Sequence, residues 1–329
     1  MTFLAVINLS AALVMDSSFN KIISHFMHQQ YSKARIELES ILKKRPRDID
    51  ALFMQINAGQ IEIIDYESYV ISGFRFLKSI DSTLVILEKA IGNCSEDKKA
   101  QYLFYTGTVY GMKSLIQAKL GEWFNAIKNS RMYVALLKEA LEIDTTMIEP
   151  LYGIGLVDYY IGENLKWLPF MSRKARDGLD NIEKVAESSS PLNFMAKNSL
   201  AWIYVEREEY KKADALVSSV LAEYPNNTIF LRIKARIALN VKKYNEAVTL
   251  SRRLKELSQK RNPVNWSDLF DAYQILVASL AAQGKYRDCL HEANKALDLE
   301  VPVSAKKIEY VQKHLKYIVE KKKGIEEKL

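Results

Sequence analysis

Residues 209–225 read "EYKKADALVSSVLAEYP", and residues 30–46 read "QYSKARIELESILKKRP". In both stretches a tyrosine, Tyr210 or Tyr31, is followed three residues later by alanine and fifteen residues later by proline. The apolar residues between them recur every three or four positions, which is the spacing of one face of an α-helix. Proline ends such a helix because it lacks a backbone donor and clashes with the preceding turn. The pattern therefore predicts the same helix at two distant places in the chain.

The pairing of an aromatic residue with a small residue recurs along the chain. Further copies are Trp123 with Ala126, Tyr244 with Ala247, Tyr286 with Cys289 and, more loosely, the stretch around Gly178. Other amphipathic helices are predicted ahead of these copies, for example over residues 193–206, 229–240 and 269–284. Two helices form a unit of about 34 residues, which buries its apolar face only against its neighbours. With only 12 Gly and 7 Pro in 329 residues, the chain is predicted to be an all-α array of antiparallel helix pairs.

This arrangement resembles the tetratricopeptide repeat (TPR) family. The small residue expected midway along the first helix is found as Gly107, Gly155, Ala201 and Ala235, the following aromatic as Tyr110 and Tyr204, and the glycine before the second helix as Gly121 and Gly284. The resemblance covers roughly residues 16–302 and is strongest from 193 to 302. It implies a right-handed superhelical solenoid of helix pairs.

Two regions depart from a plain repeat. Residues 58–92 and 107–144 are too long for standard units, so extended helices or an inserted pair are expected in the middle of the chain. That longer arrangement resembles, more loosely, the inclusion-body-clearance-type TPR proteins and their bacterial relatives. Residues 303–329 are rich in Lys and place Ile308, Val311, Leu315 and Ile318 on one stripe, which predicts a helix that caps the last repeat.

The N-terminus contains an uncharged apolar run from Phe3 to Met15. Small residues at positions 10–12 suit cleavage by signal peptidase, whereas no Lys or Arg precedes the run. Residues 1–15 are therefore either a signal peptide, which slightly favours an exported or periplasmic protein over a cytoplasmic one, or an apolar helix of the mature protein. The run is too short to span a bilayer, and no other segment is long and apolar enough to do so.

The sequence contains no pattern that indicates catalysis. Gly153 and Gly155 would begin a dinucleotide-binding fingerprint, but Asp158 stands where its third glycine belongs and no strand precedes them. His25 and His28 lack a neighbouring ligand that would complete a metal site, and Cys94 and Cys289 form neither a disulfide framework nor a zinc motif. The chain is predicted to be a non-enzyme without metal or cofactor.

A protein or peptide partner is the favoured prediction, and nucleic acid is the alternative. The net charge of +7 and the pI of about 9.0 invite the second interpretation, but residues 303–329 hold eight Lys against four Glu and so supply most of the excess. The ninth positions of successive first helices read Trp202, Arg236 and Ala278, which is no regular basic or stacking register. Nucleic-acid binding is therefore disfavoured; neither the partner nor the oligomeric state is encoded in these patterns.

The resemblance to TPR proteins also implies a binding surface, because their ligands contact fixed positions of the first helices. Carried over to this chain, those positions are Asn198, Trp202, Glu206, Arg232, Arg236, Asn240 and Gln274. Arg232 and Arg236 lie one turn apart and are candidates to grip a carboxylate or phosphate, with Trp202 as an aromatic anchor. The alternative is that both arginines are solvated and that Trp202 packs between helices. The lysine–asparagine clamp of chaperone-binding members is not matched.

A second candidate contact is the stretch "ENLKWLPF" at residues 163–170. The preceding "PLYGIGLVDYYIG" is predicted to be the first helix of a repeat, with Gly155 at a close helix crossing. The second helix is expected to resume near Arg176, which leaves a long connection over residues 162–175. Trp167, Pro169 and Phe170 are expected either to fold back over the array or to stand out as a contact surface.

Overall fold

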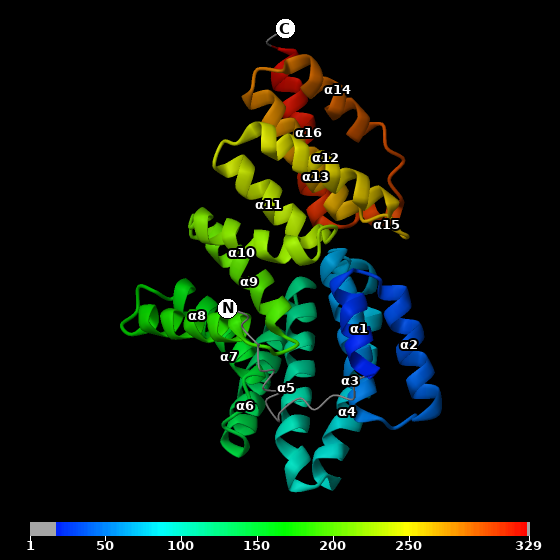
Figure 1. Ribbon diagram of the computed structural model, residues 1–329, viewed down its shortest axis with the longest axis vertical. Helices are drawn as coiled ribbons and strands as arrows, with labels where there is room; N and C mark the ends of the chain where they lie inside the picture. The colour runs from blue at the N-terminus through cyan, green and yellow to red at the C-terminus, as the bar shows by residue number, and fades with distance from the viewer. Residues whose placement is uncertain (1–17, 328–329) are drawn as a thin grey trace, which may run out of the picture. The chain divides into compact units, whose positions relative to one another are not determined.

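The computed structural model describes residues 18–327, which form sixteen helices and no strand (Figure 1). The helices are α1 Ser18–Met27, α2 Tyr31–Lys44, α3 Ile49–Asp65, α4 Tyr69–Asn93, α5 Glu96–Lys119, α6 Trp123–Ile143, α7 Glu149–Asn164, α8 Met171–Glu187, α9 Asn193–Glu206, α10 Tyr210–Glu223, α11 Thr228–Asn240, α12 Tyr244–Lys260, α13 Trp266–Ala282, α14 Tyr286–Leu297, α15 Val303–Lys306 and α16 Glu309–Glu326. The predicted all-α class is confirmed. The predicted signal peptide at residues 1–15 lies outside the described part of the chain.

Contacts within the chain divide it into two compact units. Within the described residues, unit 1 comprises residues 18–61 and 73–200, and unit 2 comprises residues 62–72 and 201–327. The end of α3 and the start of α4 therefore belong to unit 2, although the rest of both helices belongs to unit 1. The sequence pattern did not predict this division, because the repeat spacing continues through it.

The aromatic residue of the repeat pattern marks the first residue of the second helix in every clear copy. The first residues of α2, α6, α10, α12 and α14 are Tyr31, Trp123, Tyr210, Tyr244 and Tyr286. The residue two positions before each of these has positive φ; these residues are Gln29, Gly121, Glu208, Lys242 and Gly284. Such a left-handed residue turns the chain out of the first helix. The small residues one turn into each second helix, Ala34, Ala126, Ala213, Ala247 and Cys289, are all at most 5% exposed. These turns and buried contacts confirm the helix-pair architecture that the TPR resemblance implied.

A further copy of this turn precedes α4, where Glu67 has positive φ and Tyr69 begins the helix. The helices α4, α5 and α6 contain 25, 24 and 21 residues. The long middle region therefore consists of extended helices and not of an inserted pair.

The glycines of α7 lie at close crossings between helices. A Cβ atom at Gly155 would lie 2.7 Å from the carbonyl oxygen of Gly178 in α8, and one at Gly162 would lie 2.5 Å from the backbone nitrogen of Ala175. On another side of α7, a Cβ atom at Gly153 would overlap the hydroxyl of Tyr133 in α6. Because the backbones of α7 and α8 are in direct contact, these glycines serve packing, as the sequence predicted for Gly155.

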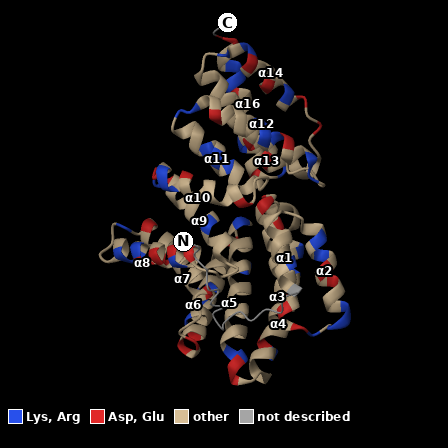
Figure 2. Cartoon of the chain, in the orientation of Figure 1, with Lys and Arg blue, Asp and Glu red and all other residues tan. Residues whose placement is uncertain are grey.

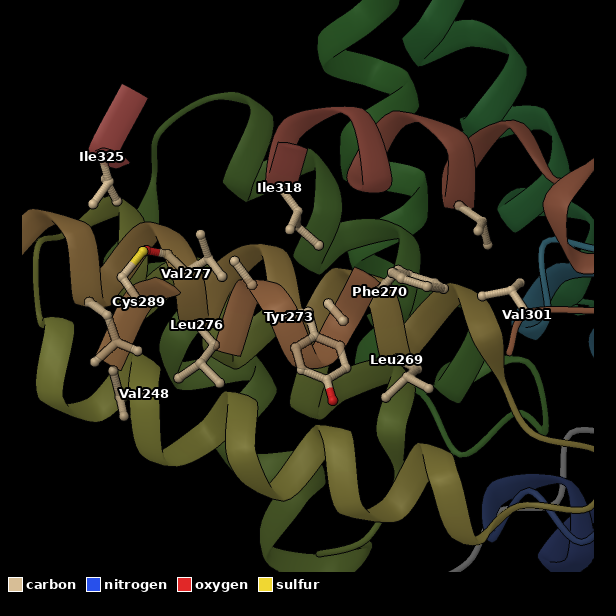
Figure 3. Packing of buried hydrophobic residues seen from close by; sticks show 14 of the residues in the cluster. Val248, Leu269, Phe270, Tyr273, Leu276, Val277, Cys289, Val301, Ile318 and Ile325 are labelled. Atoms are coloured by element: carbon tan, nitrogen blue, oxygen red, sulfur yellow. The ribbon is translucent and has the colours of Figure 1, made fainter. Parts of the chain in front are cut away.

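The predicted stripe of α16 is buried in the apolar core of unit 2 (Figure 3). Val311 and Ile318 are fully buried together with Phe270 and Leu276 of α13, and Cys289 of α14 lies in the same cluster. Leu315 packs against its edge. The C-terminal helix therefore covers the apolar side of the last helix pair, as a capping helix does.

The surface charges are mixed along the helices. Figure 2 shows both signs on α8 and on the C-terminal helices, in agreement with the interspersed Lys and Glu of α16. No helix among the described residues is long and apolar enough to cross a membrane.

Candidate functional site

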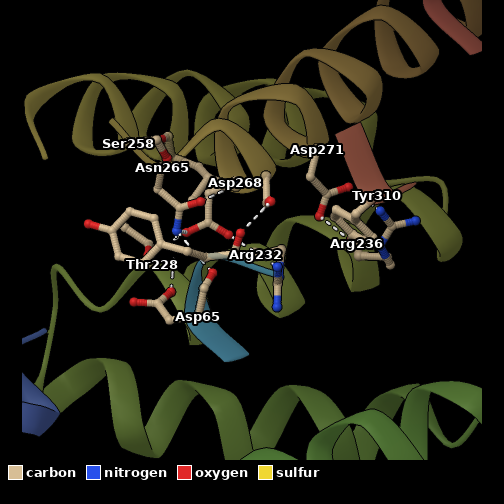
Figure 4. A network of polar contacts seen from close by, with 12 residues as sticks. Asp65, Thr228, Arg232, Arg236, Ser258, Asn265, Asp268, Asp271 and Tyr310 are labelled. Carbon is tan, nitrogen blue, oxygen red and sulfur yellow. Dashed lines mark hydrogen bonds and ion pairs between the residues drawn. The ribbon is translucent and has the colours of Figure 1, made fainter. Parts of the chain in front are cut away.

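A buried network of charged side chains lies at the N-terminal end of α13 (Figure 4). Asp268 is fully buried and accepts hydrogen bonds from Thr228 Oγ1 at 2.6 Å, Asn265 Nδ2 at 3.1 Å and Arg232 Nη1 at 3.2 Å. Asn265 also caps α13 through its side-chain oxygen, which accepts from the backbone nitrogen of Asp268. Burial raises the pKa of the Asp268 carboxyl to about 6, although the Arg232 guanidinium and the helix N-terminus both favour a negative charge at this position.

Arg232 makes cation–π contacts with two aromatic rings. Its guanidinium carbon lies 5.7 Å from the ring centre of Trp202 in α9 and 5.6 Å from that of Tyr310 in α16. The residue is 6% exposed, and both stacking distances are typical of cation–π pairs. Trp202, Arg232 and Tyr310 therefore join three helices that are distant in sequence.

Arg236 lies one turn further along α11 and pairs with a second buried aspartate. Its Nη2 atom bonds to Asp271 and lies 3.4 Å from Gln274 Oε1 on the same face of α13. The hydroxyl of Tyr310 donates to the other oxygen of Asp271 at 3.2 Å. The two arginines of α11 are thus matched by two aspartates of α13.

This pairing corrects the prediction made for the arginines. The predicted alternative of two solvated arginines is wrong for Arg232, which is buried. Each guanidinium already pairs with an aspartate, so neither is available to bind only an acidic ligand. Changing both residues to Glu would bring new carboxylates next to Asp268 and Asp271. Such a charge reversal would disturb folding and is not a clean test of partner binding.

The same network includes Asp65, the last residue of α3, and Tyr66 directly after it, both of which belong to unit 2. Arg261 Nη1 lies 2.7 Å from Asp65 Oδ2, and its guanidinium carbon lies 4.5 Å from the ring centre of Tyr66. Asn265 Nδ2 donates to the carbonyl oxygen of Asp65 at 3.1 Å, and Ser267 Oγ donates to that of Tyr66 at 2.9 Å. Each of the three arginines therefore pairs with an aspartate in this part of unit 2, and Glu67 is a further acid whose charge acts on Arg232.

His314 of α16 lies against the network, and it is 5% exposed. Burial lowers the pKa of its imidazole to about 4, even though Asp271 lies 3.7 Å from Nε2 and favours the protonated form. His314 is therefore neutral in the folded protein at neutral pH, whereas the same residue in the unfolded chain titrates near 6.5.

We expect acid to destabilise the fold through this residue. Between pH 6.5 and pH 4 the unfolded state gains a proton that the folded state does not, so the free energy of unfolding falls by about 3 kcal/mol from His314 alone. Denaturant titrations across this range should show that the free energy of unfolding falls by this amount more in the wild type than in His314→Gln. The difference between the two proteins cancels the contributions of other titrating groups. Parallel pH profiles for the two proteins would contradict the buried neutral state.

Of the remaining predicted positions, Glu206 and Asn240 belong to unit 2, whereas Asn198 belongs to unit 1. Asn198 and Glu206 lie one turn before and one turn after Trp202 on α9, and Asn240 lies one turn after Arg236 on α11. Glu206 and Asn240 are exposed, and Asn198 and Trp202 are half-buried. Of the sequence-predicted positions, Trp202 contacts Arg232 and Arg236 contacts Gln274, but Arg232 and Gln274 are buried at 6% and 9% exposed, so only Trp202 and Arg236 of these four reach the surface.

The second candidate, the loop between α7 and α8, is shorter than predicted. The helix α8 begins at Met171 and not near Arg176, because its first turns pack on Gly162, so the connection comprises only residues 165–170. Trp167 is 76% exposed and Phe170 is 83% exposed. Of the two predicted arrangements, the structure shows the one in which both side chains stand out from the helices.

Sequence reasoning missed the acidic and C-terminal members of the network. Asp271 stands seven residues before Ala278, which puts it at the second position of the repeat frame in which Ala278 is the ninth. The TPR resemblance implies ligand contacts at that position too, so the pattern was sufficient to find Asp271. Tyr310 and His314 were hidden in a Lys-rich segment, and only their spacing of four residues indicates a shared face. Asp65 had no local signal, because its partners lie about two hundred residues away.

Solved structures of two TPR proteins are similar to this chain. No protein family and no curated protein matches this chain. The C-terminal part of a TPR repeat-containing protein from Cytophaga hutchinsonii is 16% identical, with a TM-score of 0.44 over 87% of this chain and 97% of that one. A tetratricopeptide repeat protein from Parabacteroides merdae is also 16% identical, with a TM-score of 0.42 over 92% of this chain and 97% of that one.

Proposed function

We propose that the chain is a non-catalytic scaffold that binds a segment of a protein partner on the first-helix surface of unit 2. The observation that carries the proposal is the chain of contacts from Trp202 in α9 through Arg232 and Arg236 in α11 to Gln274 in α13. Trp202 and Arg236 are partly exposed, whereas Arg232 and Gln274 are buried beneath them. Side chains that project from successive first helices form one continuous surface, which is how helical-repeat proteins hold extended ligands. Trp202 supplies an amphipathic aromatic surface next to polar groups, a combination common at binding hot spots.

The charge of this surface favours a protein segment over nucleic acid. Asp268 and Asp271 neutralise Arg232 and Arg236, and Glu206 adds an exposed acid at the rim. The phosphate backbone of a nucleic acid binds to a protein surface that has an excess of cations, and the cations of this surface are matched by acids. The proposed partner therefore contributes apolar and hydrogen-bonding groups and not a run of negative charge.

Selection of peptides from a displayed random library against the full chain tests the proposal. We expect Trp202→Ala to weaken selected peptides roughly thirtyfold, because an aromatic hot spot contributes about 2 kcal/mol or more. The matched control is Trp123→Ala, which removes a tryptophan that is 65% exposed on α6 and should leave affinity unchanged. Isothermal titration gives both affinities. Equal affinity of the wild type and Trp202→Ala for the selected peptides would refute the surface, and absence of any selectable peptide would refute the scaffold function.

A further inference from the structure

Residues 62–72 form a separate piece of unit 2 that contacts the turn between α12 and α13 and the first residues of α13. They comprise the end of α3, the turn after it and the start of α4, and about 200 residues of chain separate them from the groups that they contact. A repeat in a helical array chiefly contacts its neighbours in the sequence. The contact of residues 62–72 is therefore additional to the stacking of the repeats.

The side chains of Asp65 and Tyr66 are both held by one arginine. Arg261 Nη1 lies 2.7 Å from Asp65 Oδ2, and the guanidinium carbon lies 4.5 Å from the centre of the Tyr66 ring. The hydroxyl of Tyr66 donates to the carbonyl oxygen of Pro263 at 3.1 Å. Because the guanidinium combines an ion pair with a cation–π contact, this site selects an acidic residue that is followed by an aromatic one.

Two further side chains bind the backbone of the same two residues. Asn265 Nδ2 donates to the carbonyl oxygen of Asp65 at 3.1 Å (Figure 4), and Ser267 Oγ donates to that of Tyr66 at 2.9 Å. Asp65 is the last residue of α3, and the last carbonyl oxygens of a helix have no partner within it. Glu67 follows with positive φ, which turns the chain out of the helix. The site therefore binds the end of a helix whose sequence is Asp-Tyr.

We propose that this site binds a segment of a second protein in which a helix ends in Asp-Tyr, and that residues 62–72 are a built-in competitor for it. The inference goes beyond the proposed function, because the site lies on α12 and α13 and does not include Trp202 or Arg236. Exchange would replace each contact by the same contact to the partner, so neither state leaves Arg261 without a carboxylate. A tethered segment competes at an effective concentration on the order of millimolar, so residues 62–72 exclude weak ligands.

A fluorescein-labelled peptide of residues 62–72, EIIDYESYVIS, tests the proposal with the full chain. In the wild type the chain's own turn competes with the peptide, whereas the double variant Asp65→Ala/Tyr66→Ala lacks the side chains that hold the turn. We expect the double variant to bind the peptide at least about tenfold more tightly than the wild type in titrations followed by fluorescence anisotropy. A peptide with alanine in place of its Asp-Tyr should bind the double variant at least about tenfold more weakly than the natural peptide.

Asp50→Ala is the matched control for a general loss of stability. Asp50 lies in unit 1 and accepts hydrogen bonds from Gln101 and Tyr105, so this variant also loses a contact between aspartate and tyrosine. It keeps residues 62–72 intact, and its affinity for the peptide should equal that of the wild type.

Four results would overturn the proposal. Equal affinity of the wild type and the double variant would show that the turn does not compete with the peptide, and equal affinity of the two peptides would show that Asp-Tyr is not recognised. A double variant that stays unfolded in the presence of the peptide, as measured by circular dichroism, would show that residues 62–72 are an indispensable part of unit 2. Wild-type dimers that the double variant does not form would identify the occupant as a second copy of this chain and not as a different protein.

Discussion

Replacing Asp268 with alanine lowers the free energy of unfolding by about 3–5 kcal/mol, the largest effect that we expect from a single polar side chain. The change leaves the guanidinium of Arg232 buried without its carboxylate and removes the acceptor of Thr228 and Asn265. A charge that has lost both water and its counter-ion is far more costly than the ion pair was favourable. Urea denaturation followed by circular dichroism measures the loss.

Two comparisons isolate the buried pair as the cause. Asp214→Ala breaks the pair with Lys234 in the same unit, but the Asp214 side chain is 42% exposed, so we expect a loss of at most about 1 kcal/mol. The double variant Arg232→Met/Asp268→Leu should be more stable than Asp268→Ala, because it leaves no uncompensated charge. A loss for Asp268→Ala no greater than that for Asp214→Ala would show that Arg232 is solvated after all.

A single methyl group at Gly162 or Gly178 should destabilise unit 1 by about 3 kcal/mol. The Cβ of Gly162→Ala would lie 2.5 Å from the backbone nitrogen of Ala175, and that of Gly178→Ala would lie 2.5 Å from the backbone nitrogen of Tyr159. Backbone atoms cannot move aside as a flexible side chain does, so α7 and α8 must separate. The shift in the urea midpoint of each variant measures this cost.

Gly92→Ala is the matched control, and we expect the opposite sign. Gly92 lies in α4, and no atom of a neighbouring residue lies within 4 Å of the place that the alanine methyl group would take. Alanine therefore adds helix propensity there without a clash, and the gain should be about 0.5–1 kcal/mol. If Gly162→Ala were as stable as Gly92→Ala, the close contact between α7 and α8 would be wrong.

The helix pairs were predictable because their signals are local. The aromatic residue that begins each second helix, the small residue one turn later and the following proline lie within one short stretch. Left-handed turns at Gln29, Glu208 and Lys242 were less visible, because only Gly121 and Gly284 mark that position with glycine. The boundary of α8 was misplaced because its first turn is held by Gly162 of another helix, and sequence spacing within α8 carries no trace of that contact.

The candidate site was predictable only in part. The repeat pattern selected Trp202, Arg232 and Arg236, and the structure brings Trp202 against Arg232, one turn before the equivalent position Arg236. The pattern did not reveal that Arg232 is buried, because burial depends on the aspartates of α13 and on Tyr310 of α16. The sequence likewise left two arrangements open for the loop after α7, and only the structure shows that Trp167 and Phe170 are exposed.

The sequence by itself determined the helices, their pairing, the capping role of α16 and the structural use of the glycines, since each depends on spacing within about one repeat. Only the tertiary structure decided the pairing of three arginines with three aspartates, the low pKa of His314 and the assignment of residues 62–72 to unit 2. The physical reason is range: periodicity encodes which face of a helix is buried, whereas charge compensation and desolvation depend on groups brought together from distant parts of the chain.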